Sequence, residues 1–399
     1  MDPAPPADVI VIGAGILGAS VAHHCAALGQ SVLVLESARS SCAGATGGTW
    51  AWLNANSKAP AAYARLNVEG MAEWRAHGAA AAWPGSVVLV ADAAASEAAA
   101  ARAGGDATAS EYATRAVSSA ELAALEPALA PATAGAAAAA FADEGFVPDP
   151  PAAVRGLLSS ERVTVRFGCD VRAVRNDGSV NLANGTELRA GRAVVVAAGI
   201  RTARLLRPLG LRLPLARAPG VLATVAFAEG QQQLLSGLVV GQHAHVLPRR
   251  GGAEVVIGGE DMQHGGHDGG DEAAAAADSD GDGGWSGADT STALEVLEAA
   301  DDSDLWAEGQ RLHVEAAKLL PALAEPGCEL VRVTRAFRPM TTDGLPVIGG
   351  VPRTNGKVFV CLTHSAMTLG LLLGRLLAEE IVQSTEHAQL APYRPERFM

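Results

Sequence analysis

The chain has 399 residues, of which 49% are hydrophobic and 18% are charged. This predicts a globular protein with a sizeable core, in two domains or one large one, and the absence of an apolar run of about 18 residues excludes a membrane span. The net charge of −13 is concentrated in residues 251–310, which hold sixteen acidic residues and no Lys or Arg. The sequence has no basic stripe of the kind that binds nucleic acid, so we do not expect nucleic-acid binding.

The N-terminal sequence and the cysteines indicate the compartment. The first residues, MDPAPPADVIVIGAG, lack a basic region and pass directly into an expected strand, so we expect no secretory signal. The five cysteines are widely spaced without a CxxC pair, which argues against a disulfide or zinc framework. We therefore expect a cytoplasmic protein without a metal centre in its fold; an organellar location stays open.

Residues 8–37 predict a strand, a tight turn, a helix and a second strand. The turn has the pattern G-x-G-x-x-G. Gly13 permits the turn, Gly15 lets a pyrophosphate approach the backbone, and Gly18 lets the helix pack on the strand. Glu36 ends the second strand, where a carboxylate accepts hydrogen bonds from ribose hydroxyls. The unit predicts an adenine dinucleotide site; a glycine-rich turn without a ligand is the alternative.

The next segment, CAGATGGTWAWLNANSK at residues 42–58, favours FAD over NAD. Its many Gly, Ala and Thr residues suit a backbone that passes close to a ligand, and we find only one dinucleotide fingerprint in the chain. Residues 162–174 and 191–206 predict further strands of the same sheet. Ala198 and Gly199 follow one of these strands, where a bulky side chain would block the dinucleotide.

The chain outside its acidic segment resembles the D-amino-acid oxidase family of FAD-dependent oxidoreductases, which includes glycine oxidase and sarcosine oxidase. The resemblance covers residues 8–58, 145–260 and 310–385, and is most specific in RPMTTDGLPVIGG and GKVFVCLTHSAMTLGLLLGRLLAEEI. It implies an α/β fold with a doubly wound, Rossmann-like FAD-binding domain assembled from discontinuous segments. It also implies a smaller α+β substrate domain with an antiparallel sheet.

We divide the chain on this basis. The expected FAD-binding domain comprises residues 1–87, 145–215 and 325–399, and the substrate domain comprises residues 88–144 and 216–324. Residues 221–229, 236–241 and 245–249 are the expected strands of the substrate domain. Within it, the acidic residues 262–304 are expected to form a disordered surface loop, because so polar a segment buries too little apolar surface to offset its ordering entropy.

The resemblance implies that Arg338 grips a substrate carboxylate. Pro339 keeps Arg338 out of the α region, and a guanidinium can hold a carboxylate with two parallel hydrogen bonds. A surface ion pair, or a partner for the turn at Asp343, is the alternative role. The resemblance also implies that residues 364–369 lie against the flavin ring at a helix start, where the dipole stabilises the reduced flavin anion.

The expected site residues fall into three groups. The expected FAD-binding residues are Gly13, Ala14, Gly15, Ile16, Leu17, Gly18, Glu36, Ser37, Ala45, Thr46, Gly48, Thr49, Trp50, Val171, Ala198, Gly199, His364, Ser365, Met367, Thr368 and Leu369. The expected substrate-binding residues are Arg338, His245 and Trp52, and the expected catalytic residues are Arg338 and His364. Residues 334–350 contain no cysteine and Cys361 lies in a strand-like run, so we expect non-covalent FAD.

Each histidine in these groups has an alternative role. His245 occupies a position where amino-acid-oxidising relatives often carry a tyrosine, which puts an α-amino-acid substrate in doubt; it donates a hydrogen bond there or only fills a pocket. His364 is the titratable candidate for proton transfer near the flavin ring, and a flavin-packing role is its alternative.

The acidic segment also offers two metal-binding patterns. Asp278, Asp280 and Asp282 match the start of an EF-hand loop, but Asp289 stands where a bidentate glutamate is expected. Histidines at 264 and 267 are candidates for a surface ion or simply solvated spacers.

We expect hydride transfer to the flavin from a C–H bond next to nitrogen, in an amino acid or N-substituted amine that carries a carboxylate. Dioxygen or a carrier protein would reoxidise the flavin. The alternatives are a 2-hydroxy-acid dehydrogenase, or a flavin-binding protein whose acidic loop recruits a partner or metal. The substrate identity and the oligomeric state stay open.

Overall fold

The computed structural model describes residues 6–78, 81–90, 112, 114–129, 137–227, 234–259 and 302–399. Most of the acidic segment, residues 262–301, lies outside these ranges. The predictions for its loop, its EF-hand-like aspartates and its histidines therefore stay predictions.

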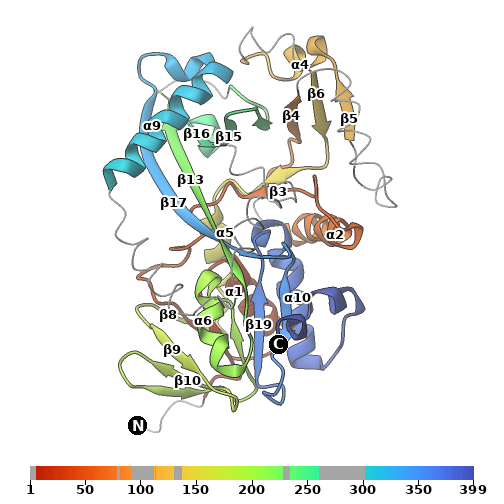
Figure 1. Ribbon diagram of the computed structural model, residues 1–399, viewed down its shortest axis with the longest axis vertical. Helices are drawn as coiled ribbons and strands as arrows, with labels where there is room; N and C mark the ends of the chain where they lie inside the picture. Colours follow the sequence, from red (N-terminus) through yellow and green to blue (C-terminus); the bar gives the residue numbers. More distant parts are fainter. Residues whose placement is uncertain are drawn as a thin grey trace, which may run out of the picture.

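A six-stranded sheet forms the lower half of the molecule (Figure 1). Its strand order is β18 (Val347–Gly350), β19 (Val358–Leu362), β12 (Ala193–Val196), β1 (Val9–Ile12), β2 (Val32–Leu35) and β8 (Val163–Arg166). All neighbours pair in parallel except β18, which is antiparallel to β19. Every residue of β1, β2 and β12 is buried, as expected for parallel strands covered on both faces.

The two faces of this sheet have different covers. Val9 and Val11 of β1 contact a core shared with the helices α1 (Ile16–Ala27), α2 (Ala61–His77) and α10 (Ala366–Gln383). Ile10 and Ile12 point the other way, into a core shared with α6 (Thr202–Leu206) and a small antiparallel sheet. The alternation of β1 side chains thus anchors layers on both sides of the sheet, which is the doubly wound arrangement.

The prediction that residues 162–174 lie in one sheet is wrong for their second half. β9 (Val171–Val174) belongs to the small three-stranded sheet with β10 (Ser179–Leu182) and β11 (Glu187–Arg189). The reason is local: Gly178 has a positive φ of 77°, and Asp177 accepts a hydrogen bond from the Ser179 N–H (3.0 Å). This turn folds β10 back onto β9.

An eight-stranded sheet, here called the roof sheet, forms the upper half of Figure 1. Its order is β17 (Glu329–Thr341), β13 (Leu215–Ala226), β16 (Glu254–Gly258), β15 (His245–Arg249), β14 (Leu238–Val240), β4 (Ser86–Val90), β6 (Ala137–Phe141) and β5 (Thr114–Val117). Of the predicted strands, 221–229 is confirmed for residues 221–226, which belong to β13; 236–241 contains β14, and 245–249 is β15. All its pairs are antiparallel except β14 with β4.

The remaining elements complete the described chain. The helices α4, α5 and α9 span Ser119–Leu125, Pro150–Leu157 and Asp302–Leu319, and β3 (Trp52–Leu53) pairs with β7 (Gly145–Phe146). Short 3-10 helices lie at Gly199–Arg201, Arg207–Leu209, Arg250–Gly252, Pro321–Ala324, Ala388–Tyr393 and Pro395–Phe398.

The long strands β13 and β17 join the two halves (Figure 1). They pair along their full length, from Leu215 opposite Thr341 to Ala226 opposite Glu329. β17 therefore belongs to the roof sheet, although residues 325–399 were assigned to the FAD-binding domain. The domain boundaries stay a prediction, because the paired strands β13 and β17 extend through both halves and no position in the chain separates the two halves completely.

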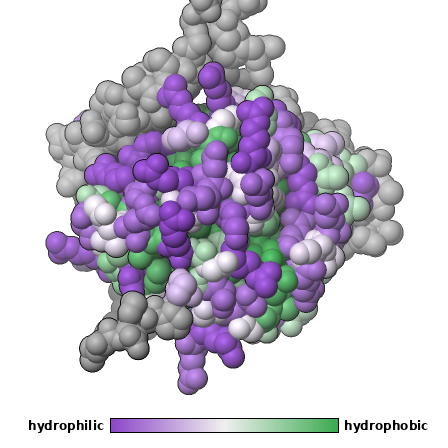
Figure 2. Space-filling view, turned by 90° about the horizontal axis from the view of Figure 1, so that it is seen from below, coloured by the Kyte–Doolittle hydropathy of each residue, from purple (hydrophilic) through white to green (hydrophobic). Residues whose placement is uncertain are grey.

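The face seen from below in Figure 2 is mostly hydrophilic, with apolar residues in small groups between polar ones, as expected for a surface that water hydrates. Among the described residues, no helix has the length and apolar character to cross a bilayer.

Candidate active site

A cavity of about 570 Å³ lies between the six-stranded sheet and β17. Its wall is built where strands of this sheet end: Ile12 at the end of β1, Glu36 after β2, Ala197 after β12 and Thr363 after β19. The carboxyl ends of parallel strands are where doubly wound proteins bind ligands. The size is also typical of a small-molecule or cofactor site.

Most of the predicted cofactor residues line this cavity. They are Gly13, Gly15, Ile16, Leu17, Glu36, Ser37, Ala45, Thr46, Gly48, Thr49, Val171, Ala198, Gly199, His364 and Met367. Arg338, the predicted substrate residue, lies in the same wall. One continuous cavity thus collects the nucleotide-loop residues and the residues predicted to lie at the flavin ring.

The glycine loop leaves no room for side chains at two of its three glycines. Gly13 has a φ of 106°, and a Cβ atom there would lie 2.5 Å from the Ala197 carbonyl oxygen. At Gly18 a Cβ atom would overlap with the Gly13 carbonyl oxygen. Gly15 is the residue that precedes α1 and itself lines the cavity. The loop therefore brings the start of α1, with its backbone N–H groups, to the cavity wall.

Glu36 is held by backbone donors. Its Oε2 accepts a hydrogen bond from the Ala14 N–H (2.8 Å) and its Oε1 accepts one from the Ala38 N–H (2.9 Å). These bonds fix the carboxylate at the cavity wall, where it retains lone pairs for ribose hydroxyls. Ala14, predicted as a cofactor residue, is buried and its N–H is the donor to Glu36, so its contact with the cofactor stays a prediction.

The segment around Thr46 closes over the start of α1. The Thr46 hydroxyl accepts a hydrogen bond from the Ile16 N–H (3.1 Å). On its other side, a Cβ atom at Gly48 would lie 2.7 Å from the Cβ of Ala336 on β17. The abundance of small residues in this segment is therefore explained by its tight position between α1 and the roof sheet.

The start of α10 forms the opposite end of the cavity. His364, Ala366 and Met367 line the wall there. The Ser365 hydroxyl makes no cap hydrogen bond to the helix, and it accepts a hydrogen bond from the Tyr63 hydroxyl (2.8 Å). The N-terminal N–H groups of α10 thus have no side-chain cap, and the helix presents the positive end of its dipole to this end of the cavity.

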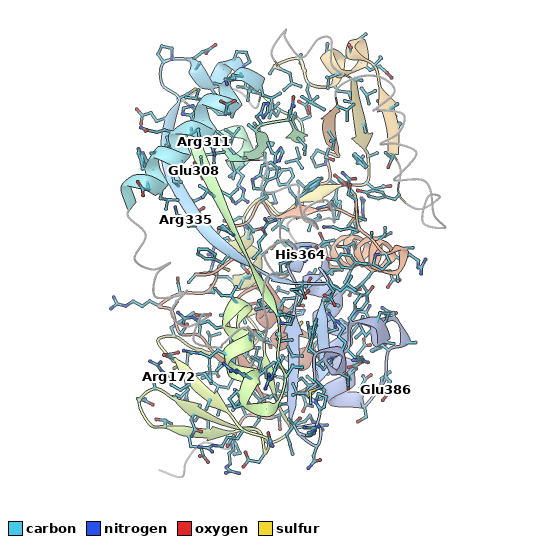
Figure 3. The ribbon with its side chains drawn as sticks, in the orientation of Figure 1. Arg172, Glu308, Arg311, Arg335, His364 and Glu386 are labelled. Atoms are coloured by element: carbon cyan, nitrogen blue, oxygen red, sulfur yellow. The ribbon has the colours of Figure 1, made fainter. Side chains whose placement is uncertain are left out.

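His364 lies where the two halves of the molecule meet (Figure 3). Burial, together with the charges of Lys58 and Arg338, lowers its pKa to about 3. Neither ring nitrogen has a hydrogen-bond partner among the described residues. A histidine with so low a pKa is neutral near pH 7 and holds a proton poorly, which favours the flavin-packing interpretation over proton transfer.

Arg338 is carried to the cavity by extended backbone, as predicted. It lies in β17 opposite Ala218, three residues before the strand ends at Thr341. The turn at Asp343 has another partner: the Arg397 guanidinium pairs with the Asp343 carboxylate (2.8 Å). The clamp role of Arg338 and its alternative roles stay predictions. Arg335, on the same strand, also lines the cavity and is labelled in Figure 3.

Several predicted residues support the site from outside the cavity wall that the described residues form. Leu369 is in the core beneath α10, and the Thr368 hydroxyl donates to the Trp52 carbonyl oxygen (3.3 Å). Trp50 and His245 are buried together in the roof, with their ring centroids 5.2 Å apart and their planes nearly perpendicular. Substrate contacts of His245 and Trp52 stay predictions.

No sequence pattern indicated the buried acid Glu144. Its carboxylate accepts hydrogen bonds from the Trp52 indole (2.8 Å) and from the hydroxyls of Ser86 and Tyr112. Burial raises its pKa to about 7. These donors come from distant parts of the chain, so no local pattern could have predicted the cluster. Arg201 and Arg204, also missed, follow Gly199 and could have been found as neighbours of that glycine.

Comparison with known proteins agrees with this geometry. A family model described as FAD dependent oxidoreductase, the DAO family, matches residues 8–380. The chain belongs to this family. The cavity fits the FAD of this family, since the glycine loop and the start of α10 bring backbone N–H groups to its wall and the Glu36 carboxylate lies there as an acceptor.

Individual relatives are distant. Glycine oxidase from Pseudomonas putida is 27% identical over 243 residues, which are 60% of this chain and 56% of that protein. The chain spans about half the length of the curated glycine oxidases it matches. Glycine oxidase from Geobacillus kaustophilus has a similar structure, with a TM-score of 0.75, 23% identity and 99% of both chains covered. L-amino acid deaminase from Proteus vulgaris gives a TM-score of 0.74 at 17% identity, covering 100% of this chain and 96% of that one.

Gly15→Val should abolish FAD loading. A Cβ atom at this position would already lie 3.0 Å from the Thr46 Oγ1, and the branched side chain would take the place of the pyrophosphate. The measurement is the ratio of flavin to protein absorbance after purification. Gly156→Ala in α5, where a Cβ atom meets nothing within 4 Å, is the control and should load FAD fully. Normal FAD loading of Gly15→Val would show that this loop is not the phosphate site.

Glu144→Gln should change how stability depends on pH. Because the pKa of Glu144 is raised from 4.5 to about 7, the folded protein keeps a proton that the unfolded chain loses between these values. The free energy of unfolding should therefore fall with rising pH by up to about 3 kcal/mol from this group, and the variant should lack that fall. Urea unfolding at pH 5 and pH 8 measures it. Parallel pH dependence of wild type and variant would contradict the assignment.

Proposed function

We propose that the protein oxidises an amino acid or N-substituted amine that carries a carboxylate, and that non-covalent FAD takes the hydride. The observation that carries this proposal is the single cavity that runs from Glu36 and the glycine loop to Arg338 and His364. The guanidinium of Arg338 can donate two parallel hydrogen bonds, and it lies in the same cavity as the dinucleotide loop. This arrangement suits a small substrate with a carboxylate. The relatives named as glycine oxidase and L-amino acid deaminase support the same class.

Arg338 would bind the substrate carboxylate with two parallel hydrogen bonds and thereby fix the α-carbon. Bound FAD would supply the electron-accepting chemistry, which protein side chains lack. The start of α10 would stabilise negative charge at this end of the cavity through its uncapped N–H groups. His364, neutral near pH 7, would pack in the site without adding a charge.

The cysteine chemistry supports non-covalent FAD. Cys42 lines the cavity, but burial raises its pKa to about 11, and burial raises the pKa of Cys361 in β19 to about 12. Both thiols thus stay protonated and are poor nucleophiles. Acid precipitation should therefore release FAD from the protein. No disulfide involves Cys25, Cys42, Cys169 or Cys361, which supports a reducing, cytoplasmic location as part of the proposal.

Arg338→Ala should lower kcat/KM for carboxylate substrates while FAD stays bound. Loss of a charge-assisted pair costs on the order of 2–5 kcal/mol when the partner is buried with the substrate. Arg338→Lys should recover little, because an ammonium cannot reproduce the two parallel bonds of the guanidinium. Steady-state kinetics with amino acids and with amines that lack a carboxylate measure the effect.

Arg332→Ala is the matched control, since Arg332 lies on the same strand but is exposed and outside the cavity wall. It should leave kcat/KM nearly unchanged. Equal loss with carboxylates and neutral amines in Arg338→Ala would show a structural role and reject the clamp. Product analysis distinguishes the proposed amine oxidation from the alternative oxidation of a 2-hydroxy acid. Amine oxidation releases ammonia or methylamine, whereas a 2-hydroxy-acid dehydrogenase forms a keto acid alone.

A further inference from the structure

Arg204 and Arg335 line the cavity, outside the proposed substrate clamp. Arg204 lies in α6, and Arg335 is the middle residue of β17 (Figure 3). The 3-10 helix Gly199–Arg201, which leads into α6, lies beside β17. The two arginines therefore approach the cavity from neighbouring elements of its wall.

The start of α6 lies at the end of the cavity where Glu36 is placed. Arg201, one residue before α6, donates a hydrogen bond from its Nη1 to the Ser37 Oγ (3.4 Å), and the Ser37 hydroxyl donates to the Glu36 Oε1 (3.2 Å). Arg204 follows Arg201 at the spacing that brings side chains to one face of a helix. Arg204 therefore lines the end of the cavity that is predicted to hold the nucleotide.

Arg335 reaches the same region from β17. The next residue, Ala336, lies against Gly48, where a Cβ atom would be 2.7 Å from the Ala336 Cβ. Gly48 belongs to the segment around Thr46, whose hydroxyl accepts a hydrogen bond from the Ile16 N–H at the start of α1 (3.1 Å). A pyrophosphate binds at the start of the helix that follows such a glycine loop, so Arg335 lies near the expected phosphates.

The two carboxylates of the described cavity wall already have partners. Glu36 accepts hydrogen bonds from two backbone N–H groups, and Asp170 pairs with Arg172 (3.0 Å). By contrast, no hydrogen bond or ion pair joins Arg204 or Arg335 to a described residue, and the Arg204 Nε is buried without a partner. Both side chains are half-buried. A partly dehydrated guanidinium is unfavourable until an anion pairs with it, so this part of the wall suits an anionic ligand.

We propose that Arg204 and Arg335 bind the pyrophosphate of FAD. The inference rests on FAD as the cofactor in the proposed function, and not on which substrate is oxidised. Each phosphate of the pyrophosphate carries a negative charge, and a guanidinium matches phosphate oxygens with parallel hydrogen bonds. The start of α1 offers N–H groups and only about half an elementary charge from its dipole. The two arginines supply the rest of the neutralisation and make the affinity for FAD depend on its phosphates.

Displacement of FAD from the holoenzyme tests this. Serial dilution gives the Kd for FAD, read from the flavin fluorescence that returns when FAD is released. ADP-ribose, which has the pyrophosphate, and adenosine, which lacks it, are then added as competitors. Arg204→Met and Arg335→Met should each weaken FAD and ADP-ribose at least about tenfold, as expected for loss of a partly buried charge pair, and leave the Kd for adenosine unchanged.

Arg207→Met and Arg332→Met are the matched controls. Arg207 directly follows α6 and Arg332 lies on β17, but both are exposed and outside the cavity wall, so they should keep the wild-type Kd values. The lysine variants Arg204→Lys and Arg335→Lys should recover part of the affinity for ADP-ribose, because they keep the charge and lose the parallel hydrogen bonds. The unfolding midpoint checks that each variant is folded.

The proposal is wrong for either arginine if its methionine variant binds FAD and ADP-ribose as tightly as wild type does. Equal weakening of ADP-ribose and adenosine also overturns it, because the arginine then only shapes the site. A variant that keeps its affinity for FAD but binds succinate more weakly, with propionate unchanged, would assign the arginine to a second acidic group of the substrate and reject the proposal.

These measurements are independent of the amine-oxidation reaction. A wild-type protein that binds FAD and ADP-ribose as expected but oxidises no amine would reject the proposed function and leave the role of the two arginines supported. A wild-type protein that holds no FAD and binds no ADP-ribose would overturn this inference directly.

Discussion

The close approach of Gly13 to the Ala197 carbonyl oxygen is the constraint on which the site depends. The turn after β1 passes so near the end of β12 that a single Cβ atom would not fit, and the backbone adopts a φ of 106° there. This turn sets the direction of α1. Gly18 lets the helix pack against the same turn, because a Cβ atom there would overlap with the Gly13 carbonyl oxygen. The helix N-terminus, the Thr46 segment and Glu36 are all placed by it.

The roof sheet completes the site through β17. This strand pairs with β13 over its whole length, from the upper half of the molecule down to the six-stranded sheet. Its small residue Ala336 accommodates Gly48 of the Thr46 segment, and two residues later Arg338 reaches the cavity. One strand thus fixes the distance between the nucleotide cradle and the proposed substrate clamp, since it contacts the first and carries the second.

The sequence predicted features that arise from local patterns. The glycine loop, the apolar runs of β1, β2 and β12, and the roof strands β13, β14 and β15 each follow from spacing and residue type over a few positions. The prediction placed β9 in the six-stranded sheet because an apolar run does not reveal which strand will pair with it. The turn at Asp177 and Gly178 pairs β9 with β10 in the small sheet instead. The Arg397 partner of Asp343 lies 54 residues away and the side-chain donors to Glu144 lie 32 or more residues away, where no spacing rule reaches.

Electrostatic properties were also beyond sequence reasoning. His364 was expected to titrate near neutrality because that is its ordinary behaviour, but its burial beside Lys58 and Arg338 lowers its pKa to about 3.

The central claim is that one cavity joins a flavin cradle to a carboxylate clamp for amine oxidation. The most direct measurement is anaerobic bleaching of the visible flavin bands of the purified enzyme with a panel of amino acids, N-methyl amino acids and 2-hydroxy acids. The account predicts bleaching by at least one amine that carries a carboxylate, and none by the 2-hydroxy acid of matching carbon skeleton. Bleaching by hydroxy acids alone would contradict it.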